Sequence, residues 1–341
     1  MAASSVARLT PGYFALVMAC GIVSIGLSYE GHMLLSRVLF AVGVLAFIVL
    51  LVLNVWRFIS YREEMAEDFR DPKRAFGFFT FVAGTNVLGS RAGLEGWYTA
   101  TTVALVVGGL VWLVLGYVVP WSAVLGRVER PVLRTANGTW FIAVVASQSV
   151  AIACATLAVV HQEAIVLPVL AVLAWSVGII LYAGSALFVS MRLLLYPITP
   201  EDFDPPYWVS MGAVAITVVA GANIVEMVST PMVDSIRGLA AGLSVVFWCF
   251  ATWLIPVLFA TGLWRHAHHR VPLRYEPTLW SMVFPLGMYS VASISLGRAD
   301  HLPLVEAIGS AWLWVALTAW ALVLMAMVWS LLDRRAPRDM P

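Results

Sequence analysis

The side chains best suited to chemistry in this chain are uncharged amides set within long apolar stretches. Asn86 and Gln148 each lie seven residues after an aromatic residue, Phe79 and Phe141 respectively. Within a membrane, amides either donate hydrogen bonds to an ion or link neighbouring helices, and the sequence leaves both interpretations open. Gly84 adds backbone that an anion or a neighbouring helix can approach closely. The chemistry expected of such groups is weak, reversible binding rather than covalent catalysis.

Residues that change charge are almost absent from the deep parts of these stretches. The six histidines fall in loops or at the edges, so no buried pair can hold a haem, and no Ser and His combination indicates proteolysis. The cluster His266, His268 and His269 is interpreted as a solvated loop rather than a metal site. Cys20, Cys154 and Cys249 lie in apolar stretches and predict no disulfide. We expect no enzymatic activity, no cofactor and no bound metal.

Phe284 and Pro285 form the sharpest local feature. Proline inside a helix lacks an N–H donor and displaces the carbonyl four residues earlier, that of Ser281, so a kink is predicted at Pro285. A kink would turn the Phe284 ring toward any path enclosed by the helices, where an aromatic ring closes the path by steric block and dewetting. The alternative is that Phe284 packs between helices like the other Phe residues.

The composition places these residues in a membrane. Of 341 residues, 61% are hydrophobic and 11% charged, against roughly 25% charged in soluble domains. The mean hydropathy is +0.90, and Lys73 is the sole lysine. Such a chain cannot cover a water-facing surface with polar groups. A formal net charge of +1 gives no basic field for nucleic acid, so no nucleic-acid partner is expected. We predict an all-α integral membrane protein with one transmembrane domain over residues 1–341.

Hydropathy predicts ten transmembrane helices, since each needs about 20 apolar residues. The expected spans are 11–29, 33–57, 76–90, 97–120, 138–160, 165–195, 206–228, 236–264, 277–297 and 303–332. Of the 20 Lys and Arg residues, 16 fall on the side that carries both termini, which predicts cytoplasmic termini. The segment at about 58–75 mixes acids and bases and is expected to be a short amphipathic connector on that side.

An internal repeat groups these spans into pairs. An aromatic residue opens each odd-numbered span, and the five positions are separated by 65, 62, 67 and 72 residues. The odd spans also carry the Gly, Ser, Thr, Asn and Gln residues that lipid disfavours, so they are expected to lie inside five helical hairpins around a central pore. Small residues that only mediate helix packing are the alternative. The pore-lining candidates are Phe14, Met18, Phe79, Gly84, Asn86, Phe141, Gln148, Trp208, Gly212, Trp280 and Gly287.

Four segments resemble the tellurite-resistance/dicarboxylate transporter family. They are Pro11-Gly12-Tyr13-Phe14, Gly84-Thr85-Asn86, Trp280-Ser281-Met282-Val283-Phe284-Pro285 and Ser290-Val291-Ala292. The family includes bacterial tellurite-resistance proteins, fungal malate permeases, sulfite efflux pumps and plant slow-type anion channels. The resemblance implies a homotrimer in which each protomer has its own pore, and it places Phe284 at the position of the pore gate.

Together these features predict transport of anions across the plasma membrane. The expected substrate is a C4-dicarboxylate such as malate or a small inorganic anion, which would pass a pore occluded by Phe284. The alternatives are a slow-type anion channel, a tellurite- or sulfite-related efflux protein, and a membrane scaffold that transports nothing.

Overall fold

The computed structural model describes residues 6–126 and 130–333, and within them it contains helices and no strand. Nine helices in these ranges are long and apolar enough to cross a membrane, as expected of an all-α multi-pass membrane protein. They are Pro11–Tyr29, Met33–Ser60, Tyr98–Leu125, Gly138–Ala158, Val166–Leu195, Pro205–Glu226, Pro231–His268, Pro277–Ala299 and Pro303–Asp333.

The predicted span 76–90 is not among these nine. It corresponds to the short 3₁₀ turn η2 (Ala75–Phe78) and helix α5 (Phe79–Leu94), which carries buried Asn86 and Arg91. Apart from Phe81 and Leu94, every residue of α5 is buried. Because other helices cover α5, it does not need the apolar surface that lipid demands. Its role as a tenth span remains a prediction.

Five of the helices form a closed inner ring. They are α2 (Ala15–Tyr29), α5, α7 (Ile142–Ala158), α9 (Val209–Glu226) and α11 (Trp280–Ala299). Each contacts the next in this order, and α11 returns to α2. All of them except α5 are among the nine apolar helices. In these, 78–89% of the residues in the most apolar 18-residue window are buried. This burial explains how Ser, Asn and Gln residues are accommodated in apolar stretches.

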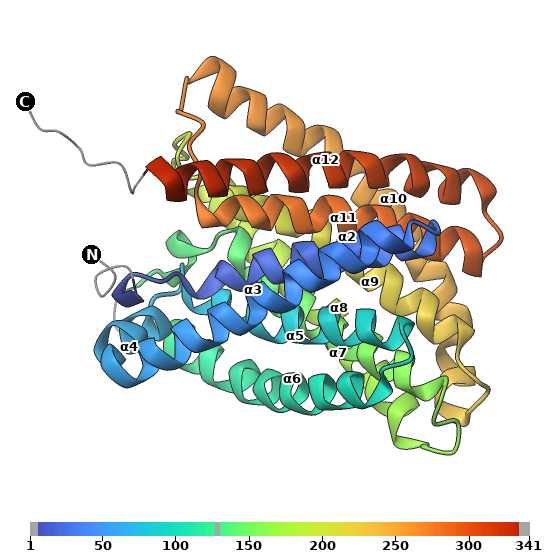
Figure 1. Ribbon diagram of the computed structural model, residues 1–341. Coiled ribbons are helices and arrows are strands. Elements are labelled where there is room, and N and C mark those ends of the chain that lie inside the picture. The colour runs from blue at the N-terminus through green and yellow to red at the C-terminus, as the bar shows by residue number, and fades with distance from the viewer. Residues whose placement is uncertain (1–5, 127–129, 334–341) are drawn as a thin grey trace, which may run out of the picture.

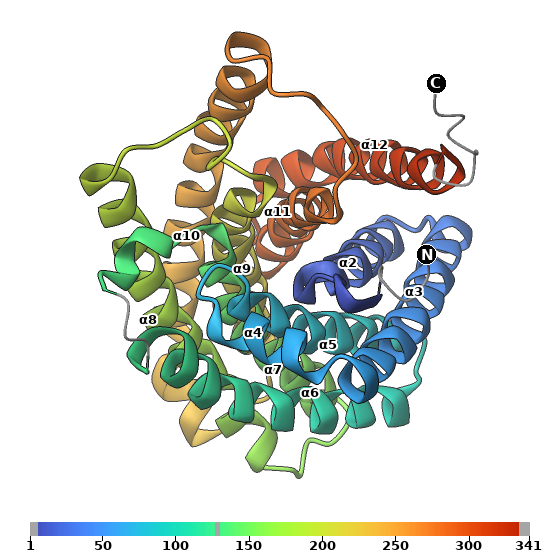
Figure 2. The same cartoon turned by 90° about the vertical axis from the view of Figure 1, so that its left-hand side faces the viewer.

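Five longer helices surround the ring (Figure 2), and each contacts the inner helix that precedes it. They are α3 (Met33–Ser60), α6 (Tyr98–Val119), α8 (Val166–Leu195), α10 (Pro231–Leu263) and α12 (Pro303–Asp333), with the π-helical extensions η3 (Pro120–Leu125) on α6 and η7 (Trp264–His268) on α10. Only 17–33% of their most apolar windows is buried. Their Val, Leu, Ile and Trp side chains point outward, as contact with lipid requires.

Each inner helix begins with a 3₁₀ turn, and the five turns contact one another in a closed order. They are η1 (Pro11–Phe14), η2, η5 (Gly138–Phe141), η6 (Pro205–Trp208) and η8 (Pro277–Leu279). Proline opens three of them, since its fixed φ suits a helix start. Asn137 caps η5 by accepting a hydrogen bond from the Thr139 N–H at 2.9 Å.

The five turns, the connector helix α4 (Arg62–Arg70) and the end of α12 lie at one end of the bundle, on the left in Figure 1. We call this end the termini end. A further 3₁₀ turn, η4 (Val132–Thr135), contacts α8. The assignment of the termini end to the cytoplasm remains a prediction, and four basic residues that contributed to it, Arg127, Arg334, Arg335 and Arg338, lie outside the described residues.

Candidate functional site

Two cavities lie inside the ring, one toward each end. The first, which we call the vestibule, has a volume of about 250 Å³ and is lined by residues at the starts of all five inner helices, Gly12, Gly77, Thr139, Pro206 and Thr278 among them. The second, which we call the axial cavity, is lined by all five inner helices nearer the far end. Its volume is about 40 Å³, enough for about three water molecules. The ring therefore encloses a wider space at the termini end and a narrow one beyond.

The lining of the axial cavity follows the aromatic repeat. The residue eight positions after each repeat aromatic lines it, and so does the residue eleven positions after. Residues three or four apart share a helix face, so the five helices present equivalent faces to one space. The first set is Ile22, Val87, Ser149, Ile216 and Met288, and the second is Ile25, Ser90, Ile152, Val219 and Val291.

A ring of buried residues lies between the two cavities on the same faces. It consists of the residues four positions after each repeat aromatic, which we call the constriction ring: Met18, Ala83, Val145, Gly212 and Phe284. On α11, Phe284 follows Ser281 of the vestibule by three residues and precedes Met288 of the axial cavity by four. Phe284 has no exposed surface, and it is the largest member of the ring. Helical spacing therefore places the aromatic ring between the two spaces.

Pro285 packs against the neighbouring helix α9. A Cβ added at Gly212 would lie 2.8 Å from the Pro285 Cγ atom, so the glycine lets the two helices approach at this level. Helix α11 runs from Trp280 to Ala299 through this proline. The kink at Pro285 remains a prediction.

The repeat aromatics themselves contact other elements and line neither cavity. Phe14 lies against Phe47 of α3, with ring centroids 5.8 Å apart. Phe141 meets Tyr182 of α8 at 5.3 Å, and Trp208 of η6 lies 5.2 Å from Phe259 of α10. The two other candidates behave similarly, since Trp280 donates its indole N–H to the hydroxyl of Tyr275 and Phe79 stacks near Phe76.

The two amides singled out by the sequence have different surroundings. Gln148 donates from Nε2 to the Trp175 carbonyl of α8 at 3.2 Å and packs against Gly178 of the same helix. Asn86 donates from Nδ2 to Ser149 Oγ of α7 at 3.1 Å and also lines the axial cavity. Gln148 thus links an inner helix to an outer one, whereas Asn86 links two inner helices and faces the cavity.

Two candidate glycines serve close contact between inner helices. A Cβ at Gly84 would lie 3.3 Å from Val17 of α2, and one at Gly287 would lie 2.9 Å from Ile22 of α2.

Sequence reasoning missed Ala83, Val145 and the aliphatic residues of the axial cavity. Counting four, eight and eleven positions from the repeat aromatics would have found them.

A family model described as voltage-dependent anion channel (SLAC1) matches residues 8–328. The chain belongs to the SLAC1 family. This confirms the resemblance to transporters of the tellurite-resistance/C4-dicarboxylate type. The SLAC1 family is one of channels and transporters rather than enzymes.

Relatives of this SLAC1-family chain carry general names. An uncharacterized membrane protein of Mycobacterium tuberculosis (strain H37Rv) is 59% identical over 148 residues, which cover 43% of this chain and 75% of the relative. An uncharacterized transporter of Methanocaldococcus jannaschii is 24% identical over 335 residues, 93% of this chain and 92% of the relative. A second uncharacterized transporter of that organism is 22% identical over 342 residues, with 95% of each chain covered.

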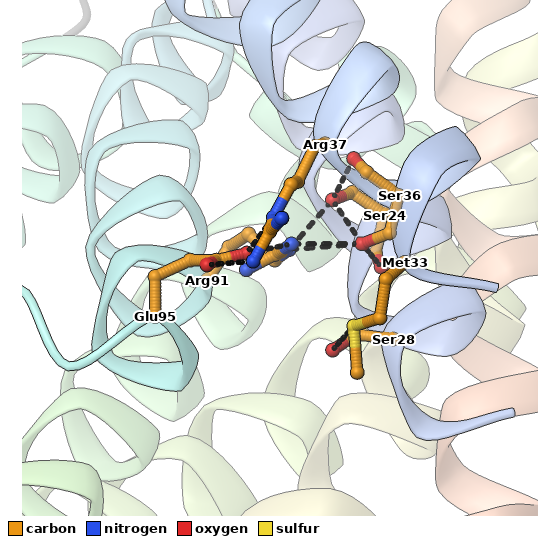
Figure 3. Close-up of polar contacts among 7 residues, drawn as sticks. All are labelled: Ser24, Ser28, Met33, Ser36, Arg37, Arg91 and Glu95. Carbon is orange, nitrogen blue, oxygen red and sulfur yellow. Dashed lines mark hydrogen bonds and ion pairs between the residues drawn. The ribbon is translucent and has the colours of Figure 1, made fainter. Parts of the chain in front are cut away.

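A buried arginine joins three helices of this SLAC1-family protein near the far end (Figure 3). Arg91 of α5 donates from Nε to Ser24 Oγ of α2 at 2.8 Å and from Nη2 to Ser36 Oγ of α3 at 2.9 Å. Its Nη2 also pairs with Glu95 Oε1 at 2.9 Å, and Glu95 pairs with Arg37 of α3 at 2.9 Å. Because none of these residues lines the axial cavity, we interpret the cluster as a clamp that holds the ring together.

This clamp makes a pH-dependent contribution to stability. Hydrogen bonds from Arg37 and then Arg91 lower the pKa of Glu95 to about 2, from an ordinary value of about 4.3. The stabilisation is therefore present above the ordinary pKa and is lost as the pH falls toward 2. We expect Glu95→Gln to lower the thermal unfolding midpoint in detergent at pH 6, and the difference from wild type to shrink between pH 5 and pH 3. Glu63→Gln is the control, because Glu63 is exposed on α4. This substitution should leave the unfolding midpoint unchanged throughout the range from pH 3 to pH 6.

Proposed function

We propose that the chain transports anions along the axis of its inner ring. The observation that carries the proposal is the equivalent placement of five helix faces around two cavities separated by one constriction ring. In this proposal ten helices cross the membrane as five hairpins, with α5 added to the nine apolar helices as the tenth span. Each protomer contains its own pore. Phe284 occludes the pore at the constriction ring.

The lining suits an anion that binds weakly. Among the residues that the structure describes, no Asp, Glu, Lys, Arg or His side chain lines the axial cavity. Its polar groups are hydroxyls and amides such as Asn86, Ser149 and Asn223. Lys73 and Arg74 line the vestibule, where positive charge raises the local concentration of anions. A neutral pore beyond a basic mouth lets an anion enter without trapping it. C4-dicarboxylates such as malate and small inorganic anions are the proposed substrates.

The assembly and location follow from the family resemblance. We propose a homotrimer in the plasma membrane, with the apolar outer surfaces of α3, α6, α8, α10 and α12 available to lipid and to neighbouring protomers. The mass of the detergent-solubilised particle, corrected for bound detergent, tests the trimer. A monomeric particle in several mild detergents would contradict it without affecting the proposed pore.

Cysteine block of anion flux tests the pathway. We would place Ile25→Cys in the axial cavity and measure efflux of nitrate, chloride and malate from liposomes, in both the wild-type and the Phe284→Ala backgrounds. The exposed Cys249 is first replaced by Ala, while Cys20 and Cys154 are buried. A membrane-impermeant thiol reagent should reduce flux to the level of protein-free liposomes, because the cavity is too narrow to admit both reagent and anion.

Leu304→Cys is the matched control for this block. Leu304 is 74% exposed near the start of α12 and lines no part of the axial cavity. Its thiol should react with the same reagent without loss of flux. Equal block of both cysteine variants would argue against an axial path. If neither the wild-type nor the Phe284→Ala background shows any flux, the scaffold alternative is favoured.

A further inference from the structure

An unpaired carboxylate oxygen lies at the vestibule. Asp204 directly precedes η6 and lines the vestibule together with Lys73 and Arg74. Its Oδ1 atom is buried and has no hydrogen-bond partner among the described residues. A buried oxygen without a donor is costly when it is charged. At the mouth of an anion path, a negative charge would also repel the transported ion.

The two arginines near Asp204, Arg265 and Arg74, have other partners. Arg265 of η7 donates from Nη1 to the carbonyls of Pro200, Glu201 and Phe203, at 3.3, 3.2 and 2.6 Å. Arg74 pairs with Asp68 at 2.9 Å. No ion pair joins Asp204 to either guanidinium in the described part of the chain. Arg265 still contributes positive potential at Asp204, and its buried Nε has no hydrogen-bond partner among the described residues.

Two further acids face the same region. Asp202 is paired with Arg192 of α8 at 3.5 Å and accepts a hydrogen bond from Thr199, and Glu276 precedes η8. Burial raises the pKa of Asp204 to about 7, Arg265 opposes the rise, and the charges of Glu276 and Asp202 add to it. The carboxyl thus changes charge within the physiological range.

We propose that Asp204 makes the vestibule a combined binding site for an anion and a proton. The inference rests on the proposed transport function and deepens it. The protonated carboxyl removes the repulsion and offers an O–H donor to the anion, alongside Lys73 and Arg74. The deprotonated carboxylate repels the same anion. By linkage, anion binding draws a proton onto Asp204 and protonation favours anion binding to the same extent.

Flux measured against pH on the termini side of the membrane tests this proposal. For a group titrating near pH 7, the protonated fraction falls about tenfold from pH 6 to pH 8, so wild-type nitrate flux should fall about tenfold as well. Asp204→Asn keeps the shape but not the charge. Its flux should be independent of pH and should match at pH 8 the wild-type value at pH 6. Asp202→Asn and Glu276→Gln remove charges that raise the pKa of Asp204, so each should move the profile to lower pH without abolishing it. Glu63→Gln, on the exposed face of α4, should keep the wild-type profile.

A binding readout separates this inference from the transport proposal. In detergent, nitrate should raise the thermal unfolding midpoint of the wild type at pH 6 and not at pH 8, because it binds the protonated vestibule. In Asp204→Asn the rise should be the same at both pH values. An Asp204→Asn variant that retains the wild-type pH dependence of nitrate binding would overturn the inference. Nitrate binding with this pattern but no flux, even with Phe284→Ala, would overturn transport alone.

Discussion

Phe284→Ala is expected to raise anion flux about tenfold or more, since each 1.4 kcal/mol removed from a barrier is worth about a factor of ten. The constriction ring is otherwise made of Met18, Ala83, Val145 and Gly212, and the phenyl ring is the largest side chain in it. Truncation to a methyl group opens a passage between the vestibule and the axial cavity. Efflux from liposomes, compared per mole of folded protein, measures the change.

Phe141→Ala is the matched control for this prediction. Phe141 has the same side chain and is almost as deeply buried as Phe284, but its ring contacts Tyr182 of α8 and lines neither cavity. Both truncations remove a core ring, a change that costs about 3–5 kcal/mol of stability. Only Phe284→Ala should raise flux. Equal flux in the two variants, or a fall in folded Phe284→Ala, would mean that the ring does not close the path.

The inner helices could be predicted from the sequence because buried helices carry polar and small residues that lipid-facing helices lack. Helices whose best windows are 78–89% buried carry Ser, Asn, Gln and Gly, whereas the outer helices are dominated by residues that suit lipid. The aromatic repeat also fixed the register of the inner helices. Met18, Gly212 and Phe284 each lie four residues after a repeat aromatic, and their role in the pore remains a prediction.

Polarity misled the prediction of individual lining residues. Gln148 and Asn86 both lie seven residues after a repeat aromatic, but only Asn86 lines the axial cavity. The positions that line it on all five helices are eight and eleven residues after the aromatic. On α7, Gln148 donates to the Trp175 carbonyl of α8, and Ser149, about 100° further around the helix, lines the cavity. The lining is mostly aliphatic, and aliphatic residues in an apolar helix give no sequence signal of their own.

Asp204 was not predicted because it lies in a connector, where an acidic residue is ordinarily solvated. It is enclosed where η6 and η8 meet at the vestibule and where Arg265 of η7 reaches the carbonyls of Pro200 and Phe203, and these elements are distant in sequence. The span at 76–90 was predicted from hydropathy but is not among the nine apolar helices, and it remains a prediction. A helix surrounded by other helices loses the apolar surface by which hydropathy recognises a membrane span.

Gly138→Ala is expected to destabilise the protein by about 3 kcal/mol, the upper end of the usual cost of overpacking. A Cβ at Gly138 would lie 2.3 Å from the carbonyl carbon and oxygen of Pro206, where η5 and η6 meet beside the vestibule. Backbone atoms cannot rotate away as a side chain can, so the two turns must separate by about an ångström to reach ordinary van der Waals contact. The thermal unfolding midpoint and the homogeneity of the purified protein measure the effect.

Gly12→Ala provides the comparison in the equivalent turn of the first repeat. Gly12 also lines the vestibule, but an added Cβ there would lie more than 4 Å from every described residue that it could contact. The thermal unfolding midpoint of Gly12→Ala should change by no more than corresponds to about 0.5 kcal/mol of unfolding free energy, as for other substitutions that create no contact. The two variants therefore separate the close approach of η5 to η6 from any general need for glycine around the vestibule. Equal midpoints for both would show that the closed ring of 3₁₀ turns tolerates separation, and the vestibule would then not depend on their contact.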